Sequence, residues 1–195
     1  MEDLKKTLDE MKLHGMQVPS NRVQINIPNA KTILKNALDY FIGLENKKAI
    51  WLTEYDKVSD WLENNEGKGL FLYGTCGKGK TVLARLVIPS ILLKYEQKVV
   101  NYYDAQQMNG KIDEVLTKKI ICIDDVGTEE ILMSYGNKRL TFLEVTDATE
   151  KQGKLLIATS NLNEEQLINK YGDRTMDRMI STTKRVLFTG KSLRR

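Results

Sequence analysis

Cysteine and histidine are scarce in this sequence, which has two cysteines and one histidine among its 195 residues. The single histidine, His14, gives no basis for a metal-binding cluster or for a nucleophile paired with a histidine. Cys76 and Cys122 both lie inside motifs described below, and a disulfide between them would lock a ligand-binding loop. We therefore interpret both as reduced thiols and expect a cytoplasmic protein.

Long apolar runs are also missing from the sequence. No stretch approaches about 18 uninterrupted apolar residues, the length typical of a membrane-spanning helix, so we expect no membrane partner. The opening residues 1–6 are of mixed charge and no apolar stretch follows them, unlike a secretory signal. Apolar residues make up 41% of the chain, enough for the core of one ordinary domain. The net charge of +4 suits contact with nucleic acid and suits an ordinary surface equally well.

The first third of the chain is predicted to be mostly helical. Apolar residues at helical spacing predict a short amphipathic helix over residues 1–14, which Gly15 ends. Two prolines and an alternation of apolar residues predict an extended linker over 17–29. Two further helices are predicted, over 31–42 and 46–64.

From residue 69 onward, short apolar runs alternate with helical stretches. This alternation is typical of a parallel sheet covered by helices on both faces. The predicted strands are 70–73, 99–103, 120–123, 155–159 and 186–188. The predicted helices are 80–93, 105–116, 137–152 and 164–179. Pro89 is expected to kink or shorten the first of these helices.

The segment 74–81 matches the phosphate-binding pattern G-x-x-x-x-G-K-[ST]. Its glycines let the backbone approach phosphates closely, and successive N–H groups at the start of the next helix attract anions. The Lys80 ammonium would reach the β- and γ-phosphates of ATP, and the Thr81 hydroxyl would bind Mg²⁺. The apolar strand before the motif and the apolar helix after it are the context that this pattern requires. The predicted nucleotide-binding residues are Gly74, Thr75, Cys76, Gly77, Lys78, Gly79, Lys80, Thr81 and Val82.

Two carboxylates follow the apolar strand 120–123. Asp124 would hold Mg²⁺, usually through water, and Asp125 would orient or deprotonate the attacking water. Two adjacent like charges at the end of a buried strand are costly without a cation, which favours this interpretation over a loop cap. Asp125 is one methylene shorter than glutamate, so the sequence leaves open whether its carboxylate reaches the attacking water.

Asn161, just after the predicted strand 155–159, and two arginines in the predicted helix 164–179 are further candidates for the site. Asn161 would hydrogen-bond the γ-phosphate or the water; alternatively, Asn161 or Asn163 caps the next helix. Arg174 and Arg178 stand at i and i+4, where like charges cost about 0.2–0.5 kcal/mol. They belong either to a salt-bridged surface helix or to an arginine finger that acts across a subunit interface, which is worth roughly 10³–10⁵ in rate.

Four segments together resemble the DnaC/IstB group of AAA+ ATPases. These segments are 69–81, 123–129, 159–162 and 172–178, and the likeness extends from about residue 48 to the C-terminus. The group contains bacterial and phage helicase loaders of DnaC and DnaI type and the IstB transposition helpers. The resemblance implies an α/β P-loop NTPase fold of the AAA+/ASCE type, a three-layer sandwich around a five-stranded parallel sheet. Since only about seven residues follow the last predicted strand, we expect no helical lid domain.

The resemblance also assigns roles to the candidate residues. It implies that Lys80 and Thr81 are Walker A residues and that Asp124 and Asp125 are Walker B residues. It further implies that Asn161 is sensor 1. For the arginine finger we favour Arg178 and keep Arg174 beside it.

The function implied by the resemblance is that of an ATP-hydrolysing DNA replication accessory protein. Such a helicase loader would assemble on ATP into a ring or helix and act on a hexameric replicative helicase. We divide the chain into a partner-binding amphipathic helix (1–16), a linker and helix (17–47) and an AAA+ ATPase core (48–195). The alternatives are an IstB-like transposition helper or other mobile-element ATPase, a small-molecule kinase, and a nucleotide switch that does not hydrolyse. Single-stranded DNA would contact basic residues from the set Lys111, Lys118, Lys119, Lys138 and Arg139.

Overall fold

The computed structural model describes residues 2–16, 18, 21–130, 132–134 and 137–193, with side chains described for 3–16, 18, 21–130 and 140–193. The strands are β1 (Gly69–Gly74), β2 (Asn101–Asp104), β3 (Ile120–Asp124), β4 (Leu132–Ser134), β5 (Asn137–Arg139), β6 (Leu155–Ser160) and β7 (Thr183–Phe188). The helices are α1 (Glu2–Leu13), α2 (Ala30–Gly43), α3 (Glu54–Glu63), α4 (Lys80–Val82), η1 (Leu83–Val87), α5 (Ile88–Glu96), α6 (Ala105–Met108), η2 (Asn109–Lys111), α7 (Ile112–Thr117), α8 (Thr141–Gln152), α9 (Glu164–Tyr171) and α10 (Asp173–Thr182).

Five strands form one parallel sheet in the order β2-β3-β6-β1-β7. This arrangement confirms the predicted five-stranded parallel sheet of an α/β sandwich. Strand β6 lies between β1, which precedes the phosphate-binding segment, and β3, which precedes the two aspartates. The carboxyl ends of all three strands therefore meet at one edge of the sheet, which is where open α/β sheets bind ligands.

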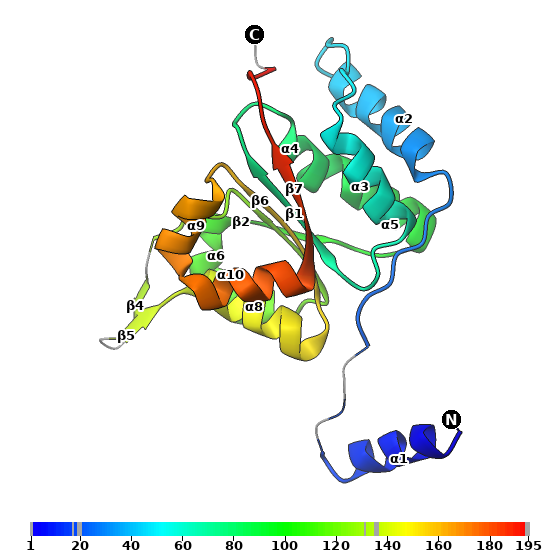
Figure 1. Ribbon diagram of the computed structural model, residues 1–195, viewed down its shortest axis with the longest axis vertical. Helices are drawn as coiled ribbons and strands as arrows, with labels where there is room; N and C mark the ends of the chain where they lie inside the picture. Colours follow the sequence, from blue (N-terminus) through cyan, green and yellow to red (C-terminus); the bar gives the residue numbers. More distant parts are fainter. Residues whose placement is uncertain (1, 17, 19–20, 131, 135–136, 194–195) are drawn as a thin grey trace.

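Helices cover the sheet on both faces, as Figure 1 shows. Successive residues of β1 point to opposite faces, so Leu70 and Leu72 join one core cluster while Phe71 and Tyr73 join the other. The first cluster packs against α2, α3 and α5, and the second packs against α6 to α10. Because both faces are buried, the strands read as continuous apolar runs, the pattern that revealed them in the sequence. Within the described part of the chain, no helix combines the length and apolar character that crossing a bilayer requires.

The N-terminal region divides into a separate helix and a segment that belongs to the body. Helix α1 stands apart from the α/β body in Figure 1. The predicted linker 17–29, whose residues 17, 19 and 20 lie outside the described residues, is extended but not free. Ile25 and Ile27 are 1% exposed and lie in the core beside α2. The Ile27 N–H donates to Leu62 O at 3.0 Å, which ties this segment to the end of α3.

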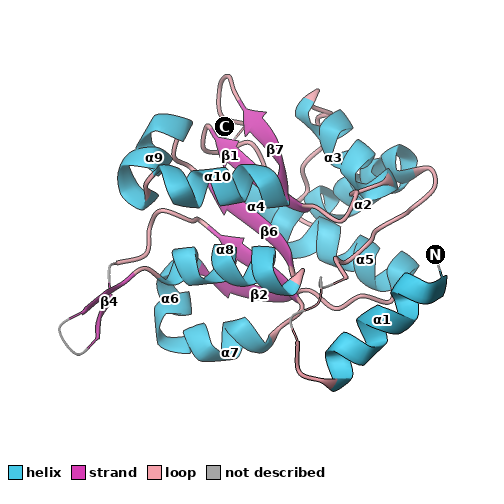
Figure 2. Cartoon of the chain, turned by 60° about the horizontal axis from the view of Figure 1, so that its bottom comes forward, coloured by secondary structure: helices cyan, strands magenta, loops and turns pink. Residues whose placement is uncertain are grey.

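Several predicted helices differ in the structure, and the one predicted over 105–116 is divided into α6, η2 and α7. The helix predicted over 46–64 begins only at Glu54. The prediction over 137–152 is wrong at its start, because residues 137–139 form β5, which pairs with β4 in an antiparallel hairpin. This hairpin projects from the body in Figure 2. The helix predicted over 164–179 is two helices, α9 and α10, because Gly172 adopts a φ of 79° between them.

Pro89 alters the helix after the phosphate-binding segment without ending it. A proline inside a helix lacks an N–H and its ring crowds the carbonyl of the residue four positions earlier. The chain responds with a π-helical stretch, η1, directly before α5, whose second residue is Pro89. The predicted shortening is wrong, because the helix continues to Glu96 and passes its predicted end at residue 93. The distortion beside Pro89 takes the form of a π-helical turn.

Candidate functional site

The loop between β1 and α4 has the backbone of a phosphate cradle. Gly74, Gly77 and Gly79 adopt φ values of 104°, 76° and 82°, which favour glycine. A Cβ on Gly74 would stand 2.4 Å from Phe188 O, so this position also needs glycine for the close approach of β7. The Thr75 N–H donates to that carbonyl at 2.9 Å and fixes the start of the loop.

Tyr55 supports the far end of the same loop from α3. Its hydroxyl donates to Lys78 O at 3.2 Å and its ring packs against Phe188. Burial raises the pKa of Tyr55 to about 12, so the hydroxyl stays a donor at neutral pH. Trp51, just before α3, packs against the same core as Tyr55. Tyr55 is therefore a core residue that also supports the glycine-rich loop.

Lys80 points back into the loop from the first residue of α4. The side chain is buried, with 5% of the residue exposed. Its Nζ donates to Gly74 O at 2.9 Å, Thr75 O at 2.8 Å and Asn161 Oδ1 at 2.9 Å. The ammonium therefore stands where the loop and the end of β6 meet, which is the position that phosphate binding requires of this lysine.

Asp124 ends β3 inside a set of hydroxyl groups. Its Oδ1 accepts hydrogen bonds from Thr81 Oγ1 at 3.2 Å and Thr159 Oγ1 at 2.5 Å, and its Oδ2 accepts one from Tyr102 OH at 3.1 Å. Burial and the neighbouring Asp124 carboxylate raise the pKa of Tyr102. The Thr81 hydroxyl and the Asp124 carboxylate are adjacent oxygen donors, the type of ligand that Mg²⁺ prefers, so these residues fit the predicted metal.

Asp125 and Asn161 face each other across the same edge. Asp125 adopts a φ of 57°, and its N–H donates to Thr159 Oγ1 at 2.9 Å. Asn161 Nδ2 donates to Asp125 Oδ1 at 2.8 Å while Asn161 Oδ1 accepts from Lys80. The Asn161 amide thus presents its oxygen to the Lys80 ammonium and its nitrogen to the Asp125 carboxylate. Helix α9 is capped by Asn163 through a capping box, so the alternative that Asn161 is the cap is wrong.

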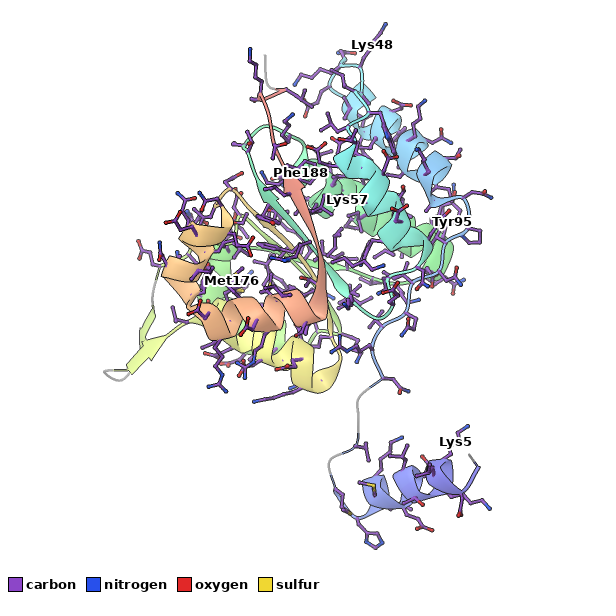
Figure 3. All side chains as sticks on the ribbon, in the orientation of Figure 1. Lys5, Lys48, Lys57, Tyr95, Met176 and Phe188 are labelled. Atoms are coloured by element: carbon purple, nitrogen blue, oxygen red, sulfur yellow. The ribbon has the colours of Figure 1, made fainter. Side chains whose placement is uncertain are left out.

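A cavity of about 350 Å³ opens beside these residues. Its phosphate side includes Gly77, Gly79, Lys80, Thr81 and Asn161, all of them predicted site residues. Its second wall was missed in the sequence and consists of Phe41, Ile42, Glu45, Lys47, Lys48 and Ile50. This wall is the end of α2 and the loop that follows it, where Figure 3 shows Lys48. Its mixture of apolar and charged side chains has no motif, so only the fold reveals it.

The two candidate arginines on α10 differ in environment. Arg178 is 13% exposed in its side chain, its Nε donates to Glu150 Oε2 at 3.0 Å, and it also pairs with Asp147. Arg174 is exposed and makes no ion pair with the residues whose side chains the structure describes. Arg178 therefore braces α10 against α8 within the chain, and Arg174 presents its charge to solvent.

Known proteins resemble this chain mainly in fold. A family model described as Nephrocystin 3, N-terminal, matches residues 48–122, which include the phosphate-binding loop. The replicative helicase loader DnaI of Bacillus subtilis (strain 168) is 30% identical over 95 residues, a match that covers 41% of this chain and 30% of DnaI. The chain thus spans less than a third of that relative.

Two solved structures carry the comparison further along the chain. The crystal structure of the DnaC helicase loader has a TM-score of 0.59 and 18% identity, covering 72% of this chain and 93% of that chain. The crystal structure of DnaI has a TM-score of 0.51 and 22% identity, covering 65% of this chain and 73% of that chain. The predicted resemblance to helicase loaders is confirmed, and the three-layer P-loop fold with it.

The two cysteines provide a direct probe of this cavity. Cys76 is exposed and lines the cavity, whereas Cys122 is buried, and burial raises the pKa of its thiol. We expect an aromatic disulfide reagent to titrate one thiol in the folded chain and two in denaturant, because only the exposed thiol reacts readily. Magnesium with a nucleoside triphosphate should slow the reaction of Cys76 about tenfold or more. Equal rates of Cys76 reaction with and without nucleotide would contradict the hypothesis that the cavity binds nucleotide.

Proposed function

We propose that this chain is an ATP-hydrolysing helicase loader of the DnaC/DnaI type. The observation that carries the proposal is the convergence of Lys80, Thr81, Asp124, Asp125 and Asn161 at one edge of a sheet. The likeness to DnaC and DnaI in fold supports it, and the shared segment with DnaI does so in sequence.

The geometry supports phosphoryl transfer from ATP to water. The loop N–H groups and the Lys80 ammonium bind the phosphates and stabilise charge on the transferred group. Thr81 and Asp124 would hold Mg²⁺, which when bound neutralises phosphate charge. Asp125 would orient the attacking water, and Asn161, which already contacts both Lys80 and Asp125, would position that water against the γ-phosphate.

Arg174 is our candidate for the arginine finger, in place of the initially favoured Arg178. A finger that acts on a neighbouring subunit must be exposed and must not already be neutralised. Arg174 meets both conditions, whereas Arg178 is paired with Asp147 and Glu150. In the assembly we propose, ATP would lie between subunits that form a ring or helix, and Arg174 of one subunit would complete the site of the next.

Replacing each arginine separately tests this proposal. We expect ATP turnover per chain to rise with protein concentration, because each site needs a second subunit. Arg174→Ala should lower turnover by about 10³-fold or more while the Kd for magnesium-ATP stays within about twofold. Arg178→Ala should instead lower the free energy of unfolding by about 1–3 kcal/mol, since it removes charged hydrogen bonds, and should keep turnover. Lys80→Ala is the reference variant, in which calorimetry should detect no binding.

Other outcomes of the same measurements favour other functions. Loss of turnover in Arg178→Ala alone would identify Arg178, and not Arg174, as the arginine finger. Turnover per chain that is independent of concentration, with phosphate passed to a small acceptor, would support a kinase. Absence of turnover with DNA and a helicase both present would support a nucleotide switch, with the short Asp125 as the cause.

Helix α1 is our candidate for docking the helicase. Leu4 and Leu8 are exposed one turn apart on one face of it, and Figure 3 shows its side chains around Lys5 away from the body. An amphipathic helix with an open apolar stripe suits binding in a groove of a partner protein. We therefore propose residues 1–16 as the partner-binding unit and 48–195 as the ATPase core, with 17–47 joining them and partly packing on the core.

A paired substitution on α1 tests the docking role. We expect Leu4→Ser with Leu8→Ser to abolish binding to the hexameric replicative helicase of the same cell, because each change removes apolar contact area. Lys5→Ser with Asp9→Ser is the matched control on the same helix and should bind normally. Both variants should keep magnesium-ATP affinity. Equal helicase binding by the two variants would refute the docking role, and capture of a transposase instead would support the transposition-helper alternative.

Single-stranded DNA is a further proposed partner, which basic side chains would contact through its phosphates. Lys111 is exposed. The Lys118 Nζ lies 3.9 Å from Glu114 Oε1, and the Lys119 Nζ donates to Asn21 O and Gln152 O. These two candidates therefore already have partners within the chain. The side chains of Lys138 and Arg139 lie outside the described residues. We expect log K for single-stranded DNA to fall linearly with log salt, as phosphate contacts require, and a flat line would exclude these contacts.

A further inference from the structure

A buried carboxylate lies behind the proposed catalytic edge and has no part in the chemistry described above. Glu129 is 6% exposed. Its Oε2 accepts a hydrogen bond from the Gly127 N–H at 2.8 Å, and its Oε1 accepts one from the Tyr171 hydroxyl. Burial and this carboxylate raise the pKa of Tyr171, so the tyrosine remains the donor. An ionised carboxylate is expensive to bury unless both oxygens are hydrogen-bonded, and here both are.

The loop that Glu129 holds is the loop that sets the direction of Asp125. The Asp125 carbonyl accepts from the Thr128 N–H at 3.1 Å and from the Thr128 hydroxyl at 2.8 Å. Gly127 has a φ of 108°, and a Cβ there would stand 2.5 Å from Leu162 Cδ1, so the loop has little room to adjust. The conformation of Asp125 therefore depends on the contacts of the three residues that follow it.

Helix α9 supplies those contacts from the other side. Lys170 Nζ donates to Gly127 O at 2.6 Å and Glu129 O at 2.9 Å. Its neighbour Tyr171 donates to the Glu129 side chain and packs its ring against Phe142 of α8. Two successive residues at the end of α9 thus bind both the backbone and the side chain of this loop.

The same tyrosine connects directly to α10. Its carbonyl accepts from the Thr175 hydroxyl at 2.8 Å, and Gly172 donates its N–H to Ile168 O at 2.7 Å where α9 ends. Arg174 lies next to Thr175 in the first turn of α10. A short chain of buried and part-buried hydrogen bonds therefore runs from the loop after Asp125 through Tyr171 to the turn that carries Arg174.

We propose that Glu129 and Tyr171 couple the nucleotide state of a subunit to the position of its own Arg174. Glu129 is a positioning residue for Asp125, and Tyr171 passes a change in that loop to α10. The inference rests on the proposed function, because only in an assembly would Arg174 meet the nucleotide of the next subunit. Its physical basis is that a packed, hydrogen-bonded element with little slack transmits displacement instead of absorbing it.

Amide hydrogen exchange on a chain that carries Arg174→Ala tests the coupling within one subunit. This background removes the proposed finger, so protection cannot come from a neighbour that it engages. A non-hydrolysable magnesium-ATP analogue should slow exchange in 74–81 and 124–129, and about fivefold in 164–178. Adding Tyr171→Phe, which removes only the hydroxyl, should keep the protection in 74–81 and abolish it in 164–178. Glu129→Gln should weaken the remote protection in the same way.

Tyr103→Phe is the matched control. It removes a hydroxyl in the same core cluster, one that donates to Glu114 Oε1 at 3.0 Å instead of to the loop, so it should preserve protection in both regions. With Arg174 intact, Tyr171→Phe should lower turnover about tenfold while the Kd for nucleotide stays within twofold, and Tyr103→Phe should change neither. Remote protection that survives Tyr171→Phe would overturn the coupling. Absence of protection at 74–81 would instead overturn the proposed function itself, and the coupling with it.

Discussion

The proposed nucleotide site depends on how the chain stabilises charged groups at a buried edge of its sheet. Lys80 and Asp124 are 5% and 3% exposed, and an uncompensated buried charge costs several kcal/mol. Neutral dipoles offset that cost: carbonyl and amide oxygens accept from Lys80, and three hydroxyls donate to Asp124. Because those groups come from β1, β2, α4, β6 and the residues that follow β1 and β6, the site forms only when these strands have assembled beside β3. The geometry of the proposed catalytic site therefore depends on the assembly of the fold.

The sequence predicted best those features that are local in the chain. The segment 74–81 contains its own glycines, lysine and hydroxyl, so one pattern predicts a complete cradle. The strands were recognisable because both of their faces are buried, and the polar ends of β3 and β6 marked the edge where we propose that the nucleotide binds. Even the position of Asn161 between the loop and the aspartates follows from the sheet order that such a fold adopts.

What the sequence did not predict depends on contacts between distant segments. The second wall of the cavity comes from residues 41–50, which precede the phosphate-binding loop by some thirty positions and carry no motif. The role that we propose for Glu129 depends on its hydrogen bond from Tyr171, 42 residues further on. The break between α9 and α10 depends on a single glycine conformation that helical spacing cannot reveal. Neither periodicity nor residue type encodes which of these segments will touch.

The two arginines of α10 illustrate how tertiary structure changes the meaning of a local pattern. On an isolated helix, like charges at i and i+4 repel by about 0.2–0.5 kcal/mol. Here Asp147 and Glu150 of α8 neutralise Arg178, so that repulsion is largely removed, and the pair also holds α10 against its neighbour. Arg174 can then keep its charge exposed on a helix that is already fixed one turn further along. A fixed helix loses little further entropy when its exposed cation meets an anion, so bracing at Arg178 prepares Arg174 for the role we propose across a subunit boundary.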